Sequence, residues 1–381
     1  MNKNLMIIAG EASGDLHGAS LIKELKNIDG GINISGIGGD KMIAAGMNAQ
    51  FHIKEMAFLG FAEVVKHIPF IKKVQNSLLD LVKKENIKTV VLIDYPGFNL
   101  SIAKKLNKLG VKIVYYISPQ IWAWGKKRIT KIKALIDKMI VVFPFEEEMY
   151  KKAEVDSVYV GHPLLERIAE YNFLTKEELY KKYNLEPGKE ILLLMPGSRK
   201  QEIEKIFPAC IKAASMLCEN FNMQTVIACS ENIDETIFNN EKEKFKFTIA
   251  KGNTYDLLKH SKFGIIKSGT STLETALFEL PFLVVYSTST ITYWIGRMLI
   301  ELSGIALVNI VAEEKIVDEL IQKDVNPQNI YTHAKSVLQN ANMYNEMKFK
   351  LGKIKNKLGE PGASKKTAEI VYKFLYDTER N

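Results

Sequence analysis

The stretch Leu5–Gly18, which reads LMIIAGEASGDLHG, decides the fold class, because it joins an apolar run to a helix through a glycine-containing turn. Leu5–Ala9 is short and soon meets Glu11 and Asp15, so it predicts a first β-strand and not a signal peptide. The turn is neither a G-x-G-x-x-G fingerprint nor a Walker loop. Its carboxylates would repel a pyrophosphate, so sugar hydroxyls suit it better. The alternative is that Ser13 or Asp15 only caps the helix.

The same alternation of short apolar runs with helical periodicity continues along the whole chain. In the first half the runs are Leu5–Ala9, Ile32–Ile37, Thr89–Ile93, Lys112–Ile117, Lys138–Val142 and Val158–Val160; in the second half they are Ile191–Met195, Thr225–Ala228, Lys246–Ile249, Phe263–Ile266 and Pro281–Val285. Strands that alternate with helices build parallel sheets through right-handed crossovers. We therefore predict the α/β class, with two Rossmann-like, doubly wound domains facing a cleft that is lined by the carboxyl ends of the strands.

A polar stretch with a turn at Leu185–Lys189 separates the two series of strands. We predict a first domain at residues 1–165, a connection at 166–189 and a second domain at 190–350. Residues 351–381 form a lysine-rich helical tail, which is expected to pack back on the first domain or on a partner subunit.

Composition and net charge limit the kinds of molecule that the protein is expected to bind. The chain has 381 residues, 46% of them hydrophobic and 25% charged, and a formal net charge of +8. No apolar run is long enough to span a bilayer, and Cys210, Cys218 and Cys229 show no metal-ligand spacing, so they are expected to be reduced thiols in a cytosolic protein. The positive charge favours anionic partners, and without a nucleic-acid-binding motif these are phosphorylated metabolites or an acidic membrane surface.

Asp94 directly follows the apolar run Thr89–Ile93. A carboxylate that is partly desolvated there would have a raised pKa and could take a proton from a nucleophilic hydroxyl. The alternative is an Asx-turn before Pro96.

The segment Ser118–Arg128 places two tryptophans before three cations. It could supply apolar walls beside an anion clamp, as a phosphorylated sugar with acyl chains would require; the alternative is core tryptophans beside a solvated basic helix face. The candidate acceptor-binding residues of this segment are Trp122, Trp124, Lys126, Lys127 and Arg128.

Two loops of the second half are candidates for binding a diphosphate. Arg199 follows a strand and can bind phosphate with two parallel hydrogen bonds, unless it is a surface arginine without a partner. Another loop opens a helix with amides and hydroxyls that form an anion cradle, and Glu274 could bind a ribose diol. The alternative is a capping box between Ser271 and Glu274. The residues of the cradle are Ser268, Gly269, Thr270, Ser271 and Thr272.

The chain has no Asp-x-Asp sequence, the usual metal site of sugar-nucleotide enzymes, so we expect no metal and no cofactor.

A stripe of apolar residues at helical spacing, with lysines beside it, lies in the segment Phe61–Val74. Such a helix can lie in a lipid interface, where each lysine near an anionic surface adds about 1 kcal/mol; the alternative is a helix that packs on its own sheet. The candidate membrane-contact residues are Phe61, Val64, Val65, Ile68, Phe70, Ile71, Lys72 and Lys73.

Taken together, these segments resemble the lipid-A-disaccharide synthases, inverting glycosyltransferases of the two-domain GT-B type. The resemblance runs nearly from end to end, and AGEASGD is its most specific part. The segments that carry it are Ala9–Gly18, Asp94–Asn99, Ser118–Arg128, Gly161–Pro163, Pro196–Arg199, Ser268–Glu274 and Leu307–Asn309.

The resemblance implies transfer of 2,3-diacylglucosamine from its UDP derivative to 2,3-diacylglucosamine 1-phosphate, which gives the β-1,6-linked disaccharide 1-phosphate and UDP. It implies that Asp94 is the general base, that Arg199 is essential, and that Asn309 lies near the donor nucleotide. It also implies contact with the inner face of the inner membrane and a possible homodimer. Glu11 and Ser13 are then expected to bind the acceptor.

The sequence departs from this family at two positions. Many relatives have a second aspartate where Gly97 stands, which strengthens the assignment of the base to Asp94, and many have proline where Val308 stands.

Two other functions remain open at the level of the sequence. A UDP-sugar 2-epimerase has the same architecture and needs neither lipid nor a membrane helix. A non-catalytic lipid-binding protein would explain the basic amphipathic helix, but it would give the anion cradle and Arg199 no function.

Overall fold

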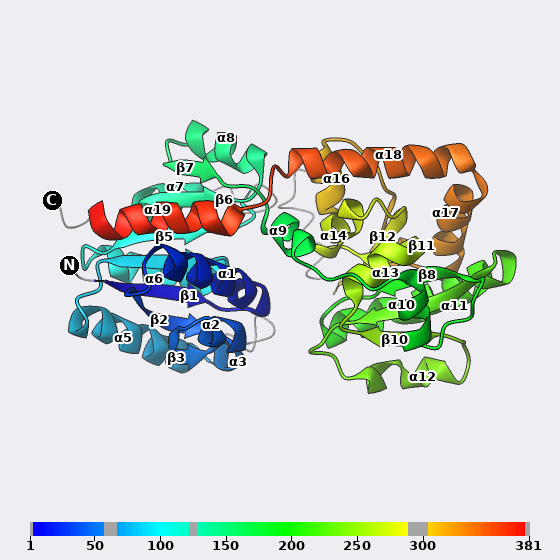
Figure 1. The fold of residues 1–381 in the computed structure, drawn as a ribbon, viewed down its shortest axis with the longest axis horizontal. Helices are drawn as coiled ribbons and strands as arrows, with labels where there is room; N and C mark the ends of the chain where they lie inside the picture. Colours follow the sequence, from blue (N-terminus) through cyan, green and yellow to red (C-terminus); the bar gives the residue numbers. More distant parts are fainter. Residues whose placement is uncertain (1–2, 57–66, 122–127, 289–303, 378–381) are drawn as a thin grey trace. The chain divides into compact units, whose positions relative to one another are not determined.

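The computed structural model describes residues 3–56, 67–121, 128–288 and 304–377, drawn as the coloured ribbon in Figure 1. The chain divides into two compact units. The first unit comprises residues 1–166 and 360–381, and the second comprises residues 167–359.

The first unit is built on a parallel sheet with the strand order β3-β2-β1-β4-β5-β6-β7. Its strands are β1 (Asn4–Ala9), β2 (Asn33–Gly38), β3 (Asn48–His52), β4 (Thr89–Ile93), β5 (Lys112–Tyr116), β6 (Lys138–Val141) and β7 (Ser157–Tyr159). Its helices are α1 (Ala12–Ile28), α2 (Asp40–Ala44), α3 (Ile53–Met56), α5 (Ile68–Lys84), α6 (Pro96–Asn107), α7 (Arg128–Leu135), α8 (Pro144–Lys152), α9 (Pro163–Ala169, whose end passes into the second unit) and α19 (Ala363–Asp377).

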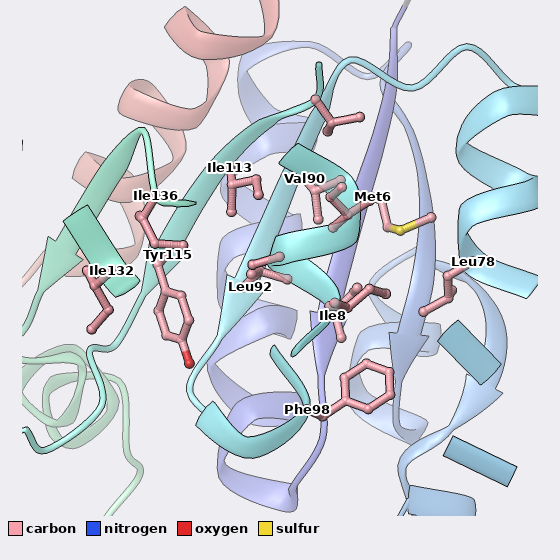
Figure 2. Close-up of a cluster of buried hydrophobic side chains, with 14 of the residues drawn as sticks. Met6, Ile8, Leu78, Val90, Leu92, Phe98, Ile113, Tyr115, Ile132 and Ile136 are labelled. Carbon is pink, nitrogen blue, oxygen red and sulfur yellow. The ribbon is translucent and has the colours of Figure 1, made fainter. Parts of the chain in front are cut away.

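The central strands of this sheet are apolar along their whole length because helices cover both faces. Every residue of Leu5–Ala9 is fully buried. Figure 2 shows part of the core on one face, where Met6, Ile8, Val90, Leu92 and other side chains from neighbouring strands meet Leu78 of α5 and Phe98 of α6.

The second unit has a parallel sheet with the strand order β10-β9-β8-β11-β12-β13. Its strands are β8 (Glu190–Met195), β9 (Met223–Cys229), β10 (Thr248–Lys251), β11 (Ser261–Lys267), β12 (Phe282–Tyr286) and β13 (Glu319–Ile321). Its α-helices are α10 (Lys176–Lys182), α11 (Lys200–Asn220), α12 (Asn239–Lys242), α13 (Thr254–His260), α14 (Ser271–Leu277), α16 (Leu307–Ala312), α17 (Pro327–Gln339) and α18 (Ala341–Lys357), and short 3-10 turns lie at Glu235–Phe238 and Gln322–Asp324. Separate apolar clusters cover its two faces.

The α/β class is confirmed, and each predicted apolar run overlaps a strand. The sequence analysis missed β3 and β13, which lie at the edges of their sheets. An edge strand needs less apolar surface than a central one, and β3 (NAQFH) has no fully buried residue.

Two of the predicted boundaries differ from the structure. The boundary between residues 350 and 351 is wrong, because α18 runs through it and buries Leu351 and Ile354. Most of the predicted connection at 166–189 lies in the second unit, where Leu179 and Tyr180 of α10 join the core. After α18 the chain returns to the first unit, where α19 packs on α1 and the Tyr376 hydroxyl donates to Asp29 at 2.8 Å.

Within the residues that the structure describes, we find no helix whose length and apolar character would let it cross a membrane.

Candidate active site

Asp94 lies in a strained turn at the carboxyl end of β4. Asp94 and Tyr95 have φ angles of 44° and 48°, a left-handed pair that non-glycine residues seldom adopt. Two buried side chains hold the main chain there. The Asn99 amide donates to the carbonyls of Ile93 at 3.2 Å and Asp94 at 2.7 Å, and the Tyr115 hydroxyl donates to the Asp94 carbonyl at 2.5 Å. The backbone of the Asp94 turn is therefore held by the fold.

Burial, and secondly the negative charge of Glu11, raise the pKa of Asp94 from 3.8 to about 6. Glu11 is close because β1 and β4 are paired, with Ala9 opposite Ile93, and Glu11 follows β1 by two residues. A carboxylate with a pKa near the working pH can both exist as a base and hold the proton that it takes. The turn therefore has the electrostatic properties of a general base.

The glycine-containing turn after β1 packs against the same structure. A Cβ atom on Gly10 would lie 2.1 Å from the Tyr95 ring, so only glycine fits there. Asp15 does not cap its own helix. It is buried, and its carboxylate accepts from the N–H groups of Gly39 at 2.7 Å, Lys41 at 3.2 Å and Met42 at 3.0 Å, at the start of α2. The helix-cap alternative is wrong for this residue, while Glu11 and Ser13 are exposed beside the turn.

Only the ends of the predicted tryptophan–lysine segment lie in the described part of the chain. Ser118 is buried and donates to the Glu146 carboxylate at 2.8 Å. Arg128 begins α7 and is exposed. Its positive charge opposes the rise that burial causes in the pKa of Tyr115, whose hydroxyl donates to the Asp94 carbonyl. Trp122, Trp124, Lys126 and Lys127 lie outside the described residues.

The predicted membrane helix is divided in the same way. Phe70 and Ile71 are partly buried and pack against the core of the first unit, where Phe70 meets Phe51 edge-to-face at 6.5 Å. This packing is what the alternative expects, and lipid contact stays a prediction for these two. Ile68 is 42% exposed, and Lys72 and Lys73 are exposed too. Phe61, Val64 and Val65 lie outside the described residues.

In the second unit, two strand ends bring cations together. β8 and β11 are paired, so the loops that follow them meet at one edge of the sheet. Arg199 is the N-cap residue of α11 and its Nη1 lies 3.5 Å from Oε1 of Glu202. Lys267, the last residue of β11, places its Nζ 2.9 Å from the same oxygen. Arg199 is thus a surface residue with a carboxylate partner.

The loop after β11 differs from the predicted cradle in one respect. The hydroxyls of Ser268, Ser271 and Thr272 donate to the carbonyls of Ile305, Lys267 and Gly269, so they are not directed at a ligand. The main chain can still donate hydrogen bonds to a ligand, because no described residue accepts one from the N–H groups at 269–271. If this loop binds an anion, as predicted, the groups left for it are the backbone amides at 269–271.

Glu274 does not form the capping box with Ser271, whose hydroxyl donates to Lys267 at 2.8 Å instead. Burial raises the pKa of Glu274, while Arg167 and Tyr255 beside it act in the opposite direction.

Asn309 has no free group in this structure. Its amide nitrogen donates to the Val317 carbonyl at 2.9 Å and to the Glu319 carboxylate at 2.8 Å, and its oxygen accepts from the N–H groups of Ile316 at 2.9 Å and Val317 at 3.1 Å. The Asn309 side chain is therefore fully hydrogen-bonded within the second unit, and its place near the donor nucleotide stays a prediction. Val308 is buried in the first turn of α16.

The sequence profile described as "Lipid-A-disaccharide synthetase" matches residues 5–374. The chain belongs to this family. It is 38% identical to the lipid-A-disaccharide synthase of Syntrophus aciditrophicus over 98% of each chain. It is 36% identical to that of Coxiella burnetii, over 98% of this chain and 99% of the other.

Two solved structures show the same fold at low sequence identity. The UDP-GlcNAc 2-epimerase from Neisseria meningitidis, bound to UDP-GlcNAc, matches with a TM-score of 0.67 and 12% identity, over 97% of this chain and 100% of the other. The calicheamicin glycosyltransferase CalG4 matches with a TM-score of 0.60 and 13% identity, over 97% and 98%. The GT-B fold and the resemblance to the lipid-A-disaccharide synthase family are confirmed, and the protein is an enzyme of the glycosyltransferase type.

The sequence analysis gave no role to Glu202, Lys267 or Tyr115 in this member of the lipid-A-disaccharide synthase family. Glu202 lies three residues after Arg199 and Lys267 directly precedes the predicted cradle, so their positions near strand ends were the available signal. Tyr115 gave no signal, since an apolar strand is expected to contain buried tyrosines. Among the described residues, no group of three or more His, Cys, Asp or Glu side chains is placed to hold a metal ion.

Proposed function

We propose that the protein transfers 2,3-diacylglucosamine from its UDP derivative to the 6-hydroxyl of 2,3-diacylglucosamine 1-phosphate. The products are the β-1,6-linked lipid A disaccharide 1-phosphate and UDP. The observation that carries this proposal is membership of the lipid-A-disaccharide synthase family over nearly the whole chain.

In this proposal Asp94 is the general base. It takes the proton of the acceptor's 6-hydroxyl while that oxygen forms a bond to the anomeric carbon of the donor. The bond from that carbon to the UDP oxygen breaks, its electron pair leaves with the β-phosphate, and attack from the opposite face inverts the anomeric centre. The pKa of about 6 and the fixed turn support the assignment.

The donor's diphosphate binds the second unit. Arg199 and the N–H groups at 269–271 meet its charge, which removes the need for a metal ion. Glu274 accepts hydrogen bonds from the ribose diol. Asn309 lies near the nucleotide and supports the segment at 316–319.

The acceptor binds the first unit beside the Asp94 turn. Glu11 and Ser13 are exposed after β1 and can bind sugar hydroxyls. Arg128, together with Lys126 and Lys127, would bind the 1-phosphate, and Trp122 and Trp124 would contact the acyl chains.

UDP release is the direct test of this function. We expect UDP to form from the acylated donor only when the acylated acceptor is present, at an unchanged rate in EDTA. Conversion of UDP-N-acetylglucosamine alone into its 2-epimer would favour the epimerase instead. Absence of UDP with both lipids present would favour a non-catalytic lipid-binding protein, and loss of the rate in EDTA would contradict metal independence.

We further propose a cytoplasmic protein that binds the inner face of the inner membrane through the start of α5. The exposed Ile68, Lys72 and Lys73 support this. Replacing both lysines with glutamine should weaken binding to vesicles that contain phosphatidylglycerol by about 30-fold, since each lysine adds about 1 kcal/mol. Sedimentation with the vesicles measures the change.

The matched control removes the same charge from the other end of the same helix, where Lys83 and Lys84 are also exposed. That variant should bind vesicles nearly as well as the unmodified protein. Equal losses in the two variants would show that only the net charge matters and would contradict a contact at the start of α5.

A further inference from the structure

We propose that Lys267 is a second cation for the donor's diphosphate and that Glu202 positions it beside Arg199. The proposal rests on the proposed function, because it assumes that a UDP-sugar binds the second unit. It adds a ligand-binding residue and a positioning residue that the sequence motifs do not contain.

The geometry joins the two cations through one atom. Oε1 of Glu202 lies 2.9 Å from Nζ of Lys267 and 3.5 Å from Nη1 of Arg199. The side chains of Glu202 and Lys267 are both only 17% exposed, whereas the Arg199 side chain is 58% exposed. One carboxylate therefore holds a lysine from one strand end and contacts an arginine from the next.

Glu202 is unusually placed for a residue that only stabilises the fold. Its other oxygen, Oε2, is buried and has no hydrogen-bond partner within the described residues. The approach depends on Gly197, where φ is +123° and a Cβ atom would lie 2.9 Å from this oxygen. A buried carboxylate oxygen without a partner is costly in free energy. The attraction of the carboxylate to Lys267 and Arg199 offsets part of that cost. Holding these two cations ready for an anion is a role that would account for a carboxylate at this position.

Lys267 also directly precedes the amide cradle. The Ser271 hydroxyl donates to the Lys267 carbonyl at 2.8 Å, so the main chain of the lysine and the start of α14 are held together. The ammonium also lies over the Tyr286 ring, with Nζ 5.6 Å from the ring centroid. An ammonium, a guanidinium and the backbone amides at 269–271 thus belong to one group.

The charges of the group suit a diphosphate without a metal ion. Arg199 and Lys267 supply two positive charges and Glu202 one negative charge. Arg199 can form two parallel hydrogen bonds to a phosphate, while the ammonium acts as a point charge. Glu202 reduces the repulsion between the two cations before the anion arrives, so they are already in position when it binds.

The test compares UDP with uridine, because uridine lacks the phosphates. For Lys267→Met we expect the Kd of UDP, measured by titration calorimetry, to rise at least about tenfold, which is the low end for a hydrogen bond to a charged group. The Kd of uridine should not change, and Lys267→Arg should recover most of the affinity for UDP. A damaged fold would weaken both ligands alike, so the comparison separates the two causes.

Lys176 provides the matched control. Its Nζ also pairs with a carboxylate, Glu190, at 3.1 Å and lies over a tyrosine ring, but this pair is at the amino end of β8. Lys176→Met should bind UDP as the unmodified protein does.

Glu202 is tested by a double-mutant cycle. If Glu202 acts through Lys267, then Glu202→Ala weakens UDP binding and the double variant with Lys267→Met is no weaker than Lys267→Met alone. Losses that simply multiply would overturn the positioning role. Unchanged UDP binding by Lys267→Met would overturn the proposal as a whole and leave the proposed function standing, whereas failure of the unmodified protein to bind UDP would overturn the proposed function itself.

Discussion

Replacing Asp94 with asparagine is expected to lower kcat by a factor of about 10² to 10⁴, the usual contribution of a general base. Asparagine has the same shape and tolerates a left-handed conformation well, so the turn at φ 44° should persist. It cannot accept the proton of the acceptor's hydroxyl. Initial rates of UDP release with both lipid substrates at saturation measure the loss.

The same substitution should raise stability, which provides its control. In the folded protein the pKa of Asp94 is raised from 3.8 to about 6, so the fold favours the protonated form. The stabilisation from that proton is complete below pH 3.8 and is lost as the pH rises through 6. Above pH 6 the ionised carboxylate costs up to about 3 kcal/mol, and neutral asparagine removes that cost.

We therefore expect a higher thermal midpoint for Asp94→Asn at pH 8, together with UDP affinity like that of the unmodified protein. A rate close to normal would remove Asp94 from the mechanism. A lower midpoint would mean that the substitution damages the fold, and the loss of rate would then say nothing about base catalysis.

Much of the fold follows from the sequence because central parallel strands are covered on both faces. Leu5–Ala9 and Thr89–Ile93 are buried throughout, so their apolar runs are unambiguous. The edge strands lack such apolar runs, so the same argument does not identify them. β13 has only three residues, and its sequence Glu-Leu-Ile does not differ from that of a loop. The boundary inside α18 was missed because polar and apolar residues alternate there without a break.

The places of Asp94 and Arg199 in the fold could also be predicted, since both follow strands, and open α/β sheets generally bind ligands at the carboxyl ends of their strands. The hydrogen-bond partners of the side chains could not. The Asn309 amide donates a hydrogen bond to the carbonyl of Val317. The Ser268 hydroxyl donates to the carbonyl of Ile305, 37 residues further along the chain. A polar residue in a loop motif has the same sequence signature whether it faces a ligand or the protein's own backbone. Only the folded chain decides between them.

The pH dependence of catalysis is expected to follow the same carboxyl group. Below pH 6 a growing fraction of Asp94 is protonated and cannot act as the base, so kcat/KM for the acceptor should fall about tenfold per pH unit, reaching roughly 100-fold at pH 4.

The charge of Glu11 is the second cause of the raised pKa, after burial, and Glu11→Gln should therefore move the inflection to lower pH. Rates of UDP release between pH 4 and pH 9, at a fixed saturating donor concentration, give both curves. Because Glu11 is also proposed to bind the acceptor, its substitution is expected to lower the rate at every pH. The coupling between the two carboxylates is therefore read from the pH of the inflection and not from the height of the plateau. A profile that stays flat down to pH 4, or an inflection that Glu11→Gln leaves unchanged, would show that the ionisation limiting the reaction is not that of Asp94 beside Glu11.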